Sequence, residues 1–220
     1  MIETEIGVNG ERLVLDALGA LYWPAEQMLV FSDLHFEKGT SFARSGQMLP
    51  PYDTRTTLKR IAALFVRYAP LRVIALGDSF HDREAADRLD EEERSCLSGF
   101  SRETDWLWIA GNHDPAPPRW LGGRVAEEIA IGGLVFRHEP TQAGVAGEIA
   151  GHLHPCKSLS RHGARLRRRC FVSDGSRMVM PAFGAYAGGL DIREPAVRTL
   201  FEEAFLAYVL GSRRIYAMAA

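Results

Sequence analysis

The sequence predicts an α/β protein, with strands and helices alternating in its first half and mostly short strands in its second. Apolar runs at residues 28–33, 71–76 and 106–110 are typical of strands buried on both faces, because apolar residues follow one another without alternating with polar ones. Between the first two runs, apolar residues recur at helical spacing over 52–69. After about residue 125, short apolar segments between glycine and proline turns indicate a sheet with few helices.

Each element has a local signal. An Asn-Gly pair at 9–10, between short alternating segments, favours an opening hairpin. The helix at 52–69 follows two prolines and offers Asp53 as an N-cap. The charged stretch at 84–99 is predicted to be helical. The later strands are expected at 125–131, 134–137, 148–150, 165–172, 177–180, 204–210 and 213–217.

Composition and charge exclude several classes of protein. With 46% hydrophobic and 25% charged residues and no linker or repeat, the 220-residue chain is expected to form one globular domain over residues 1–220. No apolar run approaches the roughly 18 residues of a membrane-spanning helix. The acidic N-terminus lacks a secretory pattern, and the three cysteines are expected to be free thiols. These features predict a cytoplasmic protein with no membrane partner.

Five polar clusters come at or just after predicted strands, and they contain five of the seven histidines. Taken alone, most such clusters are turns or caps rather than sites. Taken together, they predict one metal site, because the carboxyl ends of the strands in such folds meet at one edge of the sheet. In chain order the clusters are Asp33-Leu-His35, Gly77-Asp78, Gly111-Asn112-His113-Asp114, Arg137-His138-Glu139 and Gly151-His152-Leu-His154.

This mixture of residue types suits a pair of metal ions. Divalent cations that prefer oxygen ligands bind carboxylates, and imidazole adds affinity for transition metals. Two ions roughly 3.5–4 Å apart need a shared ligand, and the two oxygens of a carboxylate can bridge them. Water held between two such cations loses a proton near neutral pH, and the same cations neutralise phosphate oxygens.

The five motifs, over residues 33–154, resemble those of the calcineurin-like binuclear metallophosphoesterase superfamily. The resemblance implies a β-sandwich flanked by helices, with a dimetal site at the carboxyl ends of the strands. Asp78 would bridge two divalent ions. The ligand set that the resemblance implies is Asp33, His35, Asp78 and His154 for one ion, and Asp78, Asn112, His138 and His152 for the other.

The same resemblance implies roles for two further residues. His113 is expected to contact the phosphate and to stabilise or protonate the leaving oxygen. Asp114 is expected to orient His113 through the other ring nitrogen.

Several phrases resemble a bacterial subgroup, the ligase-associated metallophosphoesterases. They are Asp33-Leu-His-Phe-Glu-Lys-Gly39, Leu49-Pro-Pro-Tyr-Asp53, Gly77-Asp-Ser-Phe-His81, Pro181-Ala-Phe-Gly184 and Gly188-Gly-Leu-Asp191. The resemblance implies a DNA phosphodiesterase or endonuclease of repair, with single-stranded DNA favoured and DNA ligase and helicase as partners. It implies Mn²⁺ as the metal, with Zn²⁺, Fe²⁺ or Mg²⁺ as alternatives.

Substrate contacts are also predicted. Lys38 and His81 each lie three residues after an expected ligand and are candidates to touch substrate, against exposure to solvent as the alternative. Arg165, Arg167 and Arg169 would share one face of a strand, because successive residues point to opposite sides. That face would follow the phosphates of a nucleic acid or would simply be solvated.

Two other functions stay open on the sequence alone. The same metals would serve a small-molecule phosphatase or a nucleotide pyrophosphatase. A metallophosphoesterase fold can also act as a non-catalytic scaffold for other proteins. The complete ligand set together with His113 disfavours the scaffold, which has no need of these residues.

Overall fold

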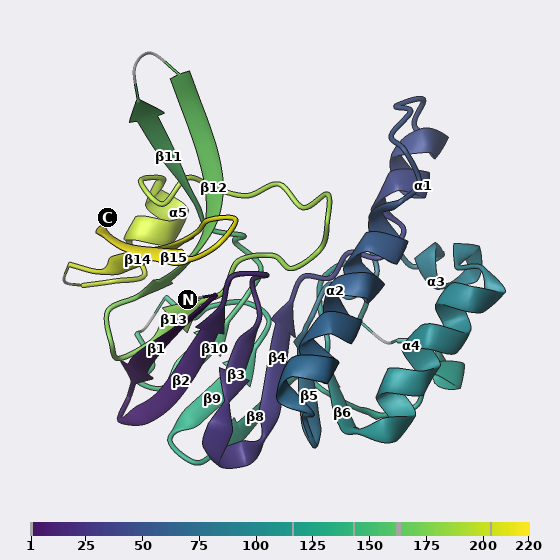
Figure 1. The fold of residues 1–220 in the computed structure, drawn as a ribbon, viewed down its shortest axis with the longest axis horizontal. Helices are drawn as coiled ribbons and strands as arrows, with labels where there is room; N and C mark the ends of the chain where they lie inside the picture. The colour runs from purple at the N-terminus through teal and green to yellow at the C-terminus, as the bar shows by residue number, and fades with distance from the viewer. Residues whose placement is uncertain (1, 116, 143, 162–163, 203) are drawn as a thin grey trace.

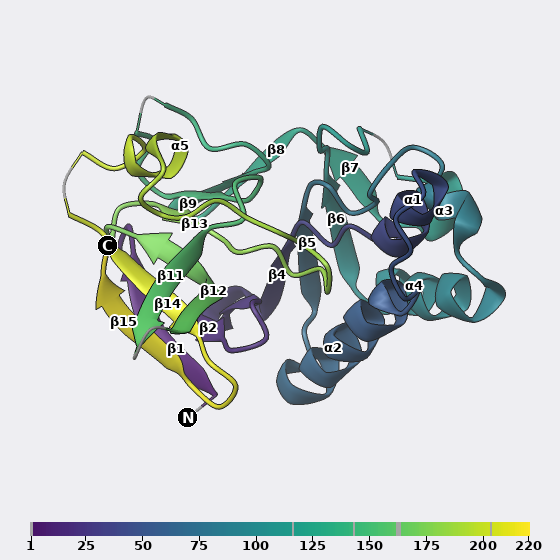
Figure 2. The same cartoon turned by 90° about the horizontal axis from the view of Figure 1, so that it is seen from above.

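The computed structural model describes residues 2–115, 117–142, 144–161, 164–202 and 204–220, and their strands form two large sheets (Figure 1). Helices α1–α4 gather on the side of the molecule away from strands β11–β15 (Figure 2). Among the described helices, none is both long enough and apolar enough to cross a membrane. The mixed α/β class that the sequence predicts is confirmed, and so is the sandwich of two sheets.

The first sheet has the order β1-β2-β3-β4-β5-β6-β7. Strands β1 to β4 pair antiparallel and β4 to β7 pair parallel. The predicted hairpin at Asn9 and Gly10 is confirmed, and both residues have the positive φ of a two-residue turn, 48° and 83°. The strands are β1 (Glu3–Val8), β2 (Glu11–Asp16), β3 (Leu21–Trp23), β4 (Met28–Ser32), β5 (Arg72–Leu76), β6 (Asp105–Ile109) and β7 (Arg124–Ala126).

The second sheet has the order β15-β14-β12-β13-β10-β9-β8, and β11 pairs with β12. The predicted strand at 125–131 is in fact two strands, because the chain passes from the first sheet to the second between them. The strand expected at 213–217 begins two residues later. The strands are β8 (Glu128–Ile131), β9 (Leu134–Arg137), β10 (Glu148–Ala150), β11 (Cys156–Arg161), β12 (Ala164–Ser173), β13 (Met178–Val179), β14 (Leu206–Leu210) and β15 (Ile215–Ala219).

An apolar core joins the two sheets. Val30 and Ile74 from the first sheet pack in one cluster with Phe136, Ile149 and Phe171 from the second, and none of the five is more than 2% exposed. Burial of this apolar area, at about 25 cal/mol per Å², is the main force that holds the sheets face to face. The sandwich therefore brings the ends of β9 and β10 next to those of β4 and β5.

A second core lies between the first sheet and the helices. The predicted helix at 52–69 is α2 (Asp53–Tyr68), and its Leu58, Ile61 and Leu64 are buried there. The stretch expected as one helix at 84–99 is two helices, α3 (Ala85–Arg88) and α4 (Glu91–Glu103). The break has a local cause: the Asp90 side chain accepts from the Glu93 amide at 2.8 Å, and Glu93 accepts in return from the Asp90 amide at 3.1 Å.

Helix α1 (Lys38–Arg44) and the short helix α5 (Pro195–Arg198) are not predicted by the sequence pattern. Bonds to the start of α2 stabilise α1: the Glu37 amide donates to Thr54 Oγ1 at 2.9 Å, and the Gly39 amide donates to Asp53 Oδ2 at 3.0 Å. Asp53 is thus not the N-cap of α2 that the sequence predicted. Its carboxylate instead fixes the beginning of α1, just beyond the loop that carries Asp33 and His35.

Removal of the Arg177 guanidinium is expected to destabilise the fold. Arg177 and Glu148 form an ion pair in which both side chains are at most 2% exposed, and Glu148 lies on the strand that leads to His152. Arg177→Met would leave buried Glu148 with only its longer contact to Arg137, at 3.6 Å, so we expect the free energy of unfolding to fall by up to about 3–5 kcal/mol in denaturant titrations. Arg102→Met, on the exposed side of α4, is the control and should change it by less than about 0.5 kcal/mol. Equal effects of the two substitutions would contradict the prediction.

Candidate metal centre

The loops after β4 and β5 bring the first two polar clusters together. The His35 amide donates to the Asp78 carbonyl at 2.9 Å, and the Phe36 amide donates to the Ser79 carbonyl at 2.8 Å. The parallel pairing of the two strands thus continues into the loops that follow them. Gly111, after β6, completes this edge, where a Cβ atom would overlap the Asp78 amide.

Five of the predicted ligands have left-handed backbone conformations. Their φ values are 51° for Asp33, 45° for His35, 46° for Asp78, 67° for His152 and 47° for His154. Such a conformation is unfavourable for residues other than glycine, and Asp, Asn and His tolerate it best. Backbone strain of this kind gathers at functional sites, where surrounding structure maintains it.

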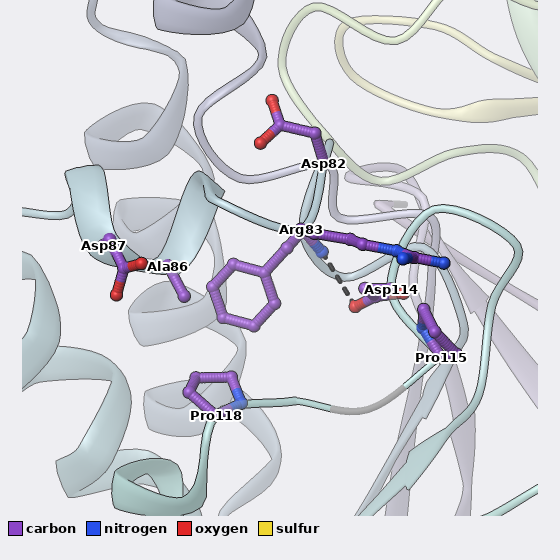
Figure 3. Close-up of a pocket in the computed structure, with 8 residues that line it drawn as sticks. Asp82, Arg83, Ala86, Asp87, Asp114, Pro115 and Pro118 are labelled. Carbon is purple, nitrogen blue, oxygen red and sulfur yellow. Dashed lines mark hydrogen bonds between the residues drawn. The ribbon is translucent and has the colours of Figure 1, made fainter.

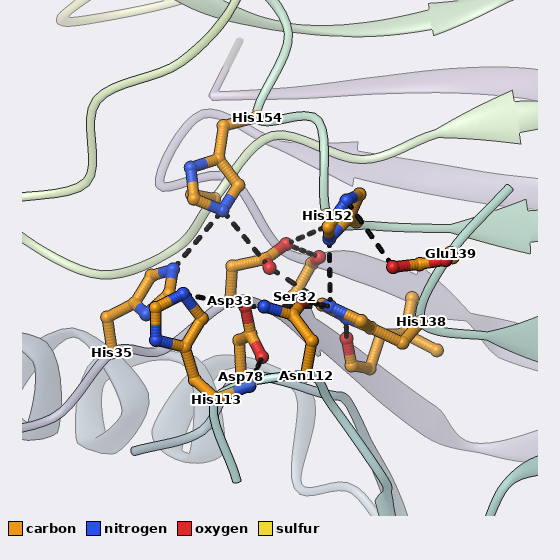
Figure 4. A network of polar contacts seen from close by, with 12 residues as sticks. Ser32, Asp33, His35, Asp78, Asn112, His113, His138, Glu139, His152 and His154 are labelled. Carbon is orange, nitrogen blue, oxygen red and sulfur yellow. Dashed lines mark hydrogen bonds and ion pairs between the residues drawn. The ribbon is translucent and has the colours of Figure 1, made fainter. Parts of the chain in front are cut away.

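Asp33, His35 and His154 form one group of donor atoms, all within 4.8 Å of one another (Figure 4). The two Nε2 atoms of His35 and His154 are 3.2 Å apart, and His154 Nε2 is 3.1 Å from Asp33 Oδ1. The other oxygen, Asp33 Oδ2, accepts hydrogen bonds from Ser32 Oγ and from the His152 amide. Asp33 is therefore fixed with Oδ1 directed at the two imidazoles.

Asp78, His138 and His152 form the second group, within the same 4.8 Å limit (Figure 4). His138 Nε2 is 3.1 Å from His152 Nδ1, 3.5 Å from Asp78 Oδ2 and 2.9 Å from Asn112 Oδ1. The opposite ring nitrogen of His138 donates to the Leu76 carbonyl at 2.9 Å. That bond directs Nε2 into the group, as outer partners of metal-binding histidines do.

The seven predicted ligands therefore come from five loops to one place, and the grouping follows the predicted division between two ions. Asp78 groups with the second set, and its Oδ1 accepts from the His113 amide at 2.9 Å. Its predicted role as the bridge between both ions stays a prediction.

The donor set fits divalent cations. Asp33 Oδ1 is buried and accepts no hydrogen bond from the described residues. In the second group, His138 Nε2 faces acceptor oxygens of Asp78 and Asn112, so a positive charge must lie among them. Carboxylate oxygens with imidazole nitrogens suit Mn²⁺, Fe²⁺ or Zn²⁺ better than Ca²⁺.

Burial and the neighbouring carboxylates shift the pKa values of the imidazoles in opposite directions. Burial lowers the pKa of His35 to about 3, although Asp33 and Asp78 oppose the shift. For His138, burial also lowers the pKa, but the bond to Asp78 and the charges of Asp33 and Asp78 outweigh it and raise the pKa to about 9. The buried carboxylates thus attract positive charge to this place.

His113 lies beside the second group, and its side chain is 40% exposed. Its Nδ1 donates to the His81 carbonyl at 2.7 Å, and its Nε2 is 3.9 Å from Asp78 Oδ2. The prediction that Asp114 orients His113 is wrong, because Asp114 Oδ2 accepts instead from the Phe80 amide at 3.0 Å. A backbone carbonyl holds the ring in place of a carboxylate.

Asp114 lies at the wall of a separate cavity of about 470 Å³ (Figure 3). Burial raises its pKa to about 7. The cavity is lined by Phe80, Asp82, Arg83, Ala86, Asp87, Asp114, Pro115 and Pro118.

The structure brings Lys38 and His81 to the predicted centre. The His81 ring packs between those of Phe42, His35 and His113, with centroids 5.3–5.9 Å apart. Lys38 is half-buried, and its ammonium lies 5.8 Å from the Phe42 ring centroid. Burial lowers the pKa of Lys38. Both residues border the place where a substrate of the two groups would lie.

The three arginines of β12 pair with alternate residues of β11, so they share a face as predicted. Arg165 and Arg167 are exposed, and Arg167 donates to the Gly189 carbonyl. Arg169 is half-buried and donates to the Ala182 carbonyl at 2.6 Å, so it does not project freely as a solvated strand residue would.

The segment after β13, whose phrases carry part of the resemblance, lies against the first ligand loop. The Phe183 amide donates to the Ser32 carbonyl at 2.7 Å, and the Gly184 amide donates to the Asp33 carbonyl at 3.1 Å. A Cβ atom at Gly184 would overlap the Leu34 carbonyl. Glycine in this otherwise apolar stretch was the signal of a close approach between backbones.

Among solved structures, the chain is similar to the nuclease MPE of Pseudomonas putida, with 30% identity and a TM-score of 0.79; the match covers 98% of this chain and 100% of that one. It is also similar to Yfce, a phosphoesterase from E. coli, with 13% identity and a TM-score of 0.42, over 87% of this chain and 98% of that one. The second likeness is too distant to carry an argument. No protein-family model matches the sequence, and no curated protein matches it.

Replacement of Asp78 tests the centre directly. We expect the purified protein to bind two divalent ions per chain, one for each group of donor atoms, and Asp78→Ala to bind at most one. The folded state should persist, because the cores are built from apolar side chains and Asp78 contributes none of them. Elemental analysis after Mn²⁺ loading, with circular dichroism, measures both quantities. Asp105→Ala, a half-exposed carboxylate at the start of β6, should still bind two ions. Two ions in Asp78→Ala would contradict the prediction.

Proposed function

Because this chain belongs to the calcineurin-like metallophosphoesterase superfamily and is a metal-dependent phosphoesterase, we propose that it hydrolyses phosphodiester bonds in single-stranded DNA. The observation that carries the proposal is the pair of donor groups beside the exposed ring of His113. The full-length similarity to a protein described as a nuclease supports a nucleic acid substrate.

We propose that Asp33, His35 and His154 hold one ion and that Asn112, His138 and His152 hold the other, with Asp78 between them. When bound, two divalent ions supply an activated nucleophile and neutralise charge on the phosphate. Four imidazoles among seven ligands favour a transition metal, while three oxygen ligands favour a hard one, so Mn²⁺ is the ion that suits both.

His113 is placed to serve the leaving oxygen. The bond from its Nδ1 to the His81 carbonyl fixes the ring, so Nε2 faces the second group of donor atoms. When the ring is protonated, Nε2–H can donate to the oxygen that leaves the phosphorus and compensate its growing negative charge. The exposed edge of the ring gives a substrate access to this proton.

The choice of DNA rests on the cations around the centre. Lys38 lies at its border, and Arg165 and Arg167 project from β12 into solvent. Positive side chains in such positions can contact successive phosphates of a nucleic acid backbone. A small substrate would not need these contacts. We propose further that the enzyme acts in DNA repair, with DNA ligase and helicase as partners.

Parallel assays of four substrates test this function. With Mn²⁺ we expect cleavage of end-labelled single-stranded DNA and of bis(p-nitrophenyl) phosphate, and slower reaction of a nucleoside diphosphate ester and a phosphomonoester. Mg²⁺ should support slower turnover, because it is a poor match for imidazole. Initial rates across a metal titration give the comparison.

The same assay contains the outcomes that count against the proposal. Preference for the diphosphate ester would indicate a nucleotide pyrophosphatase, and preference for the monoester would indicate a phosphatase. Full activity with Mg²⁺ alone would contradict the choice of metal.

Substitution of His113 separates chemistry from metal binding. We expect His113→Ala to retain both ions and to lose about 10²–10⁴ in kcat, the usual contribution of a positioned proton donor. The loss should be smaller for a phosphodiester with an acidic leaving group, since such a group needs no proton. Rates for aryl phosphodiesters of graded leaving-group pKa provide the measurement. Wild-type turnover in this variant would remove His113 from the mechanism.

A further inference from the structure

The segment from Ala182 to Gly189 borders the candidate metal centre at both of its ends. At the first end, Gly184 donates to the Asp33 carbonyl. At the other end, a Cβ atom at Gly189 would overlap the His154 carbonyl, and the Leu190 amide donates to the Leu153 carbonyl at 3.2 Å. Between these ends the segment reaches from the second sheet to the beginning of α2 (Figures 1 and 2), where the Ala185 amide donates to Thr57 Oγ1 at 3.2 Å.

Two arginines from distant parts of the chain converge on this segment. Arg60, in the middle of α2, donates from Nη1 to the Phe183 carbonyl at 3.3 Å. Arg169, on β12, donates from Nη1 to the same carbonyl at 3.2 Å. The two guanidinium groups are therefore neighbours, one peptide away from the residue that meets the Asp33 carbonyl. Both residues keep part of their surface exposed, and Arg169 also donates to the Ala182 and Leu18 carbonyls.

Neither guanidinium forms an ion pair with a carboxylate of the described residues. Other partly or fully buried arginines do: Arg88 pairs with Asp82, and Arg177 pairs with Glu148. Burial lowers the pKa of Arg60, and burial together with the charge of Arg60 lowers the pKa of Arg169 to about 10. Two like charges thus lie side by side with only carbonyl groups as partners.

In the part of the chain that the structure describes, such a pair lacks a counter-charge and has hydrogen-bond donors that no partner uses. A carbonyl oxygen uses one N–H donor, whereas a guanidinium has five, and Arg60 makes one hydrogen bond within the described residues. A phosphate presents several oxygens that accept bidentate bonds from guanidinium groups, and its negative charge would remove the repulsion between the two. An anion of this kind would be more stable here than water.

We propose that Arg60 and Arg169 form a phosphate-binding subsite that holds a backbone phosphate of the substrate strand near the phosphodiester that is cleaved. This inference rests on the proposed function, since it takes the ligand to be a nucleic acid. Arg167, which donates to Gly189 at the far end of the segment, extends the same row of cations towards Arg165. The strand would then cross the segment at Ala185, Ala187 and Gly188, where small side chains leave room for its backbone.

The salt dependence of binding tests the subsite. Each phosphate contact on a single strand contributes about 0.7 to the slope of log affinity against log salt. At 0.1 M salt such a contact is worth about fivefold in affinity, relative to 1 M salt. We expect Arg60→Gln to flatten the slope for a labelled single-stranded oligonucleotide by about that amount and to reduce affinity about fivefold. Arg60→Lys keeps the charge and should keep most of the slope. Arg102→Gln, which removes the same charge from the exposed side of α4, should change neither.

A second measurement separates phosphate binding from a purely structural role. The ratio of kcat/KM for the oligonucleotide to that for bis(p-nitrophenyl) phosphate should fall in Arg60→Gln, because the small diester does not extend to the subsite. Equal losses on both substrates, with a lowered Tm, would mean that Arg60 only supports the Phe183 carbonyl, and an unchanged salt slope would also overturn the inference. A wild-type protein that neither binds nor cleaves the oligonucleotide would overturn the proposed function as well. Competition by inorganic phosphate as strong as by the oligonucleotide would point to a free anion as the ligand.

Discussion

The constraint on which the site depends is the burial of two carboxylates, Asp33 and Asp78, at the ends of neighbouring parallel strands. A buried carboxylate without compensation costs several kcal/mol, so the surrounding loops must supply positive charge or donors. The Asp33 carboxylate accepts from the His152 amide and the Asp78 carboxylate from the His113 amide, while imidazoles from the Asp33 loop and from two further loops lie beside them. The sandwich of two sheets makes this possible, because it brings loops from opposite sheets within reach of the same two side chains.

Much of this arrangement follows from local sequence. Polar residues directly after buried strands predicted the ligand loops, because parallel neighbours end at one edge, and the periodicity of 52–69 predicted α2. Tertiary contacts decided the rest. Helix α1 contains Gly39, Thr40 and Ser41, which have weak helix propensity, and it forms because α2 supplies its partners. The meeting of Arg60 with Arg169 depends on how α2 and β12 both approach the Phe183 carbonyl, which no spacing along the chain encodes.

The distribution of charge also divides the molecule. Arginines pair with several carboxylates of the acidic stretch around α3 and α4: Arg55 with Asp90, Arg44 with Glu84 and Arg88 with Asp82. These ion pairs weaken the negative potential of the acidic stretch on the side that faces α1 and α2. The arginines of β12 and Arg60 in the middle of α2 make no such pairs in the described residues, so no carboxylate compensates their positive charge directly. This difference would steer an anionic polymer towards the positively charged residues.

The left-handed backbone of the ligand loops has a consequence for how such a centre can evolve. Glutamate or cysteine would meet the metal with suitable chemistry, yet neither tolerates a positive φ as readily as aspartate, asparagine or histidine does. A point mutation that exchanges one ligand type for another is therefore penalised twice, once by coordination geometry and once by the turn itself. The backbone conformation of these loops therefore limits which residues can serve as metal ligands, and so which metals the chain can bind. A centre rich in thiolate ligands would require many changes of sequence.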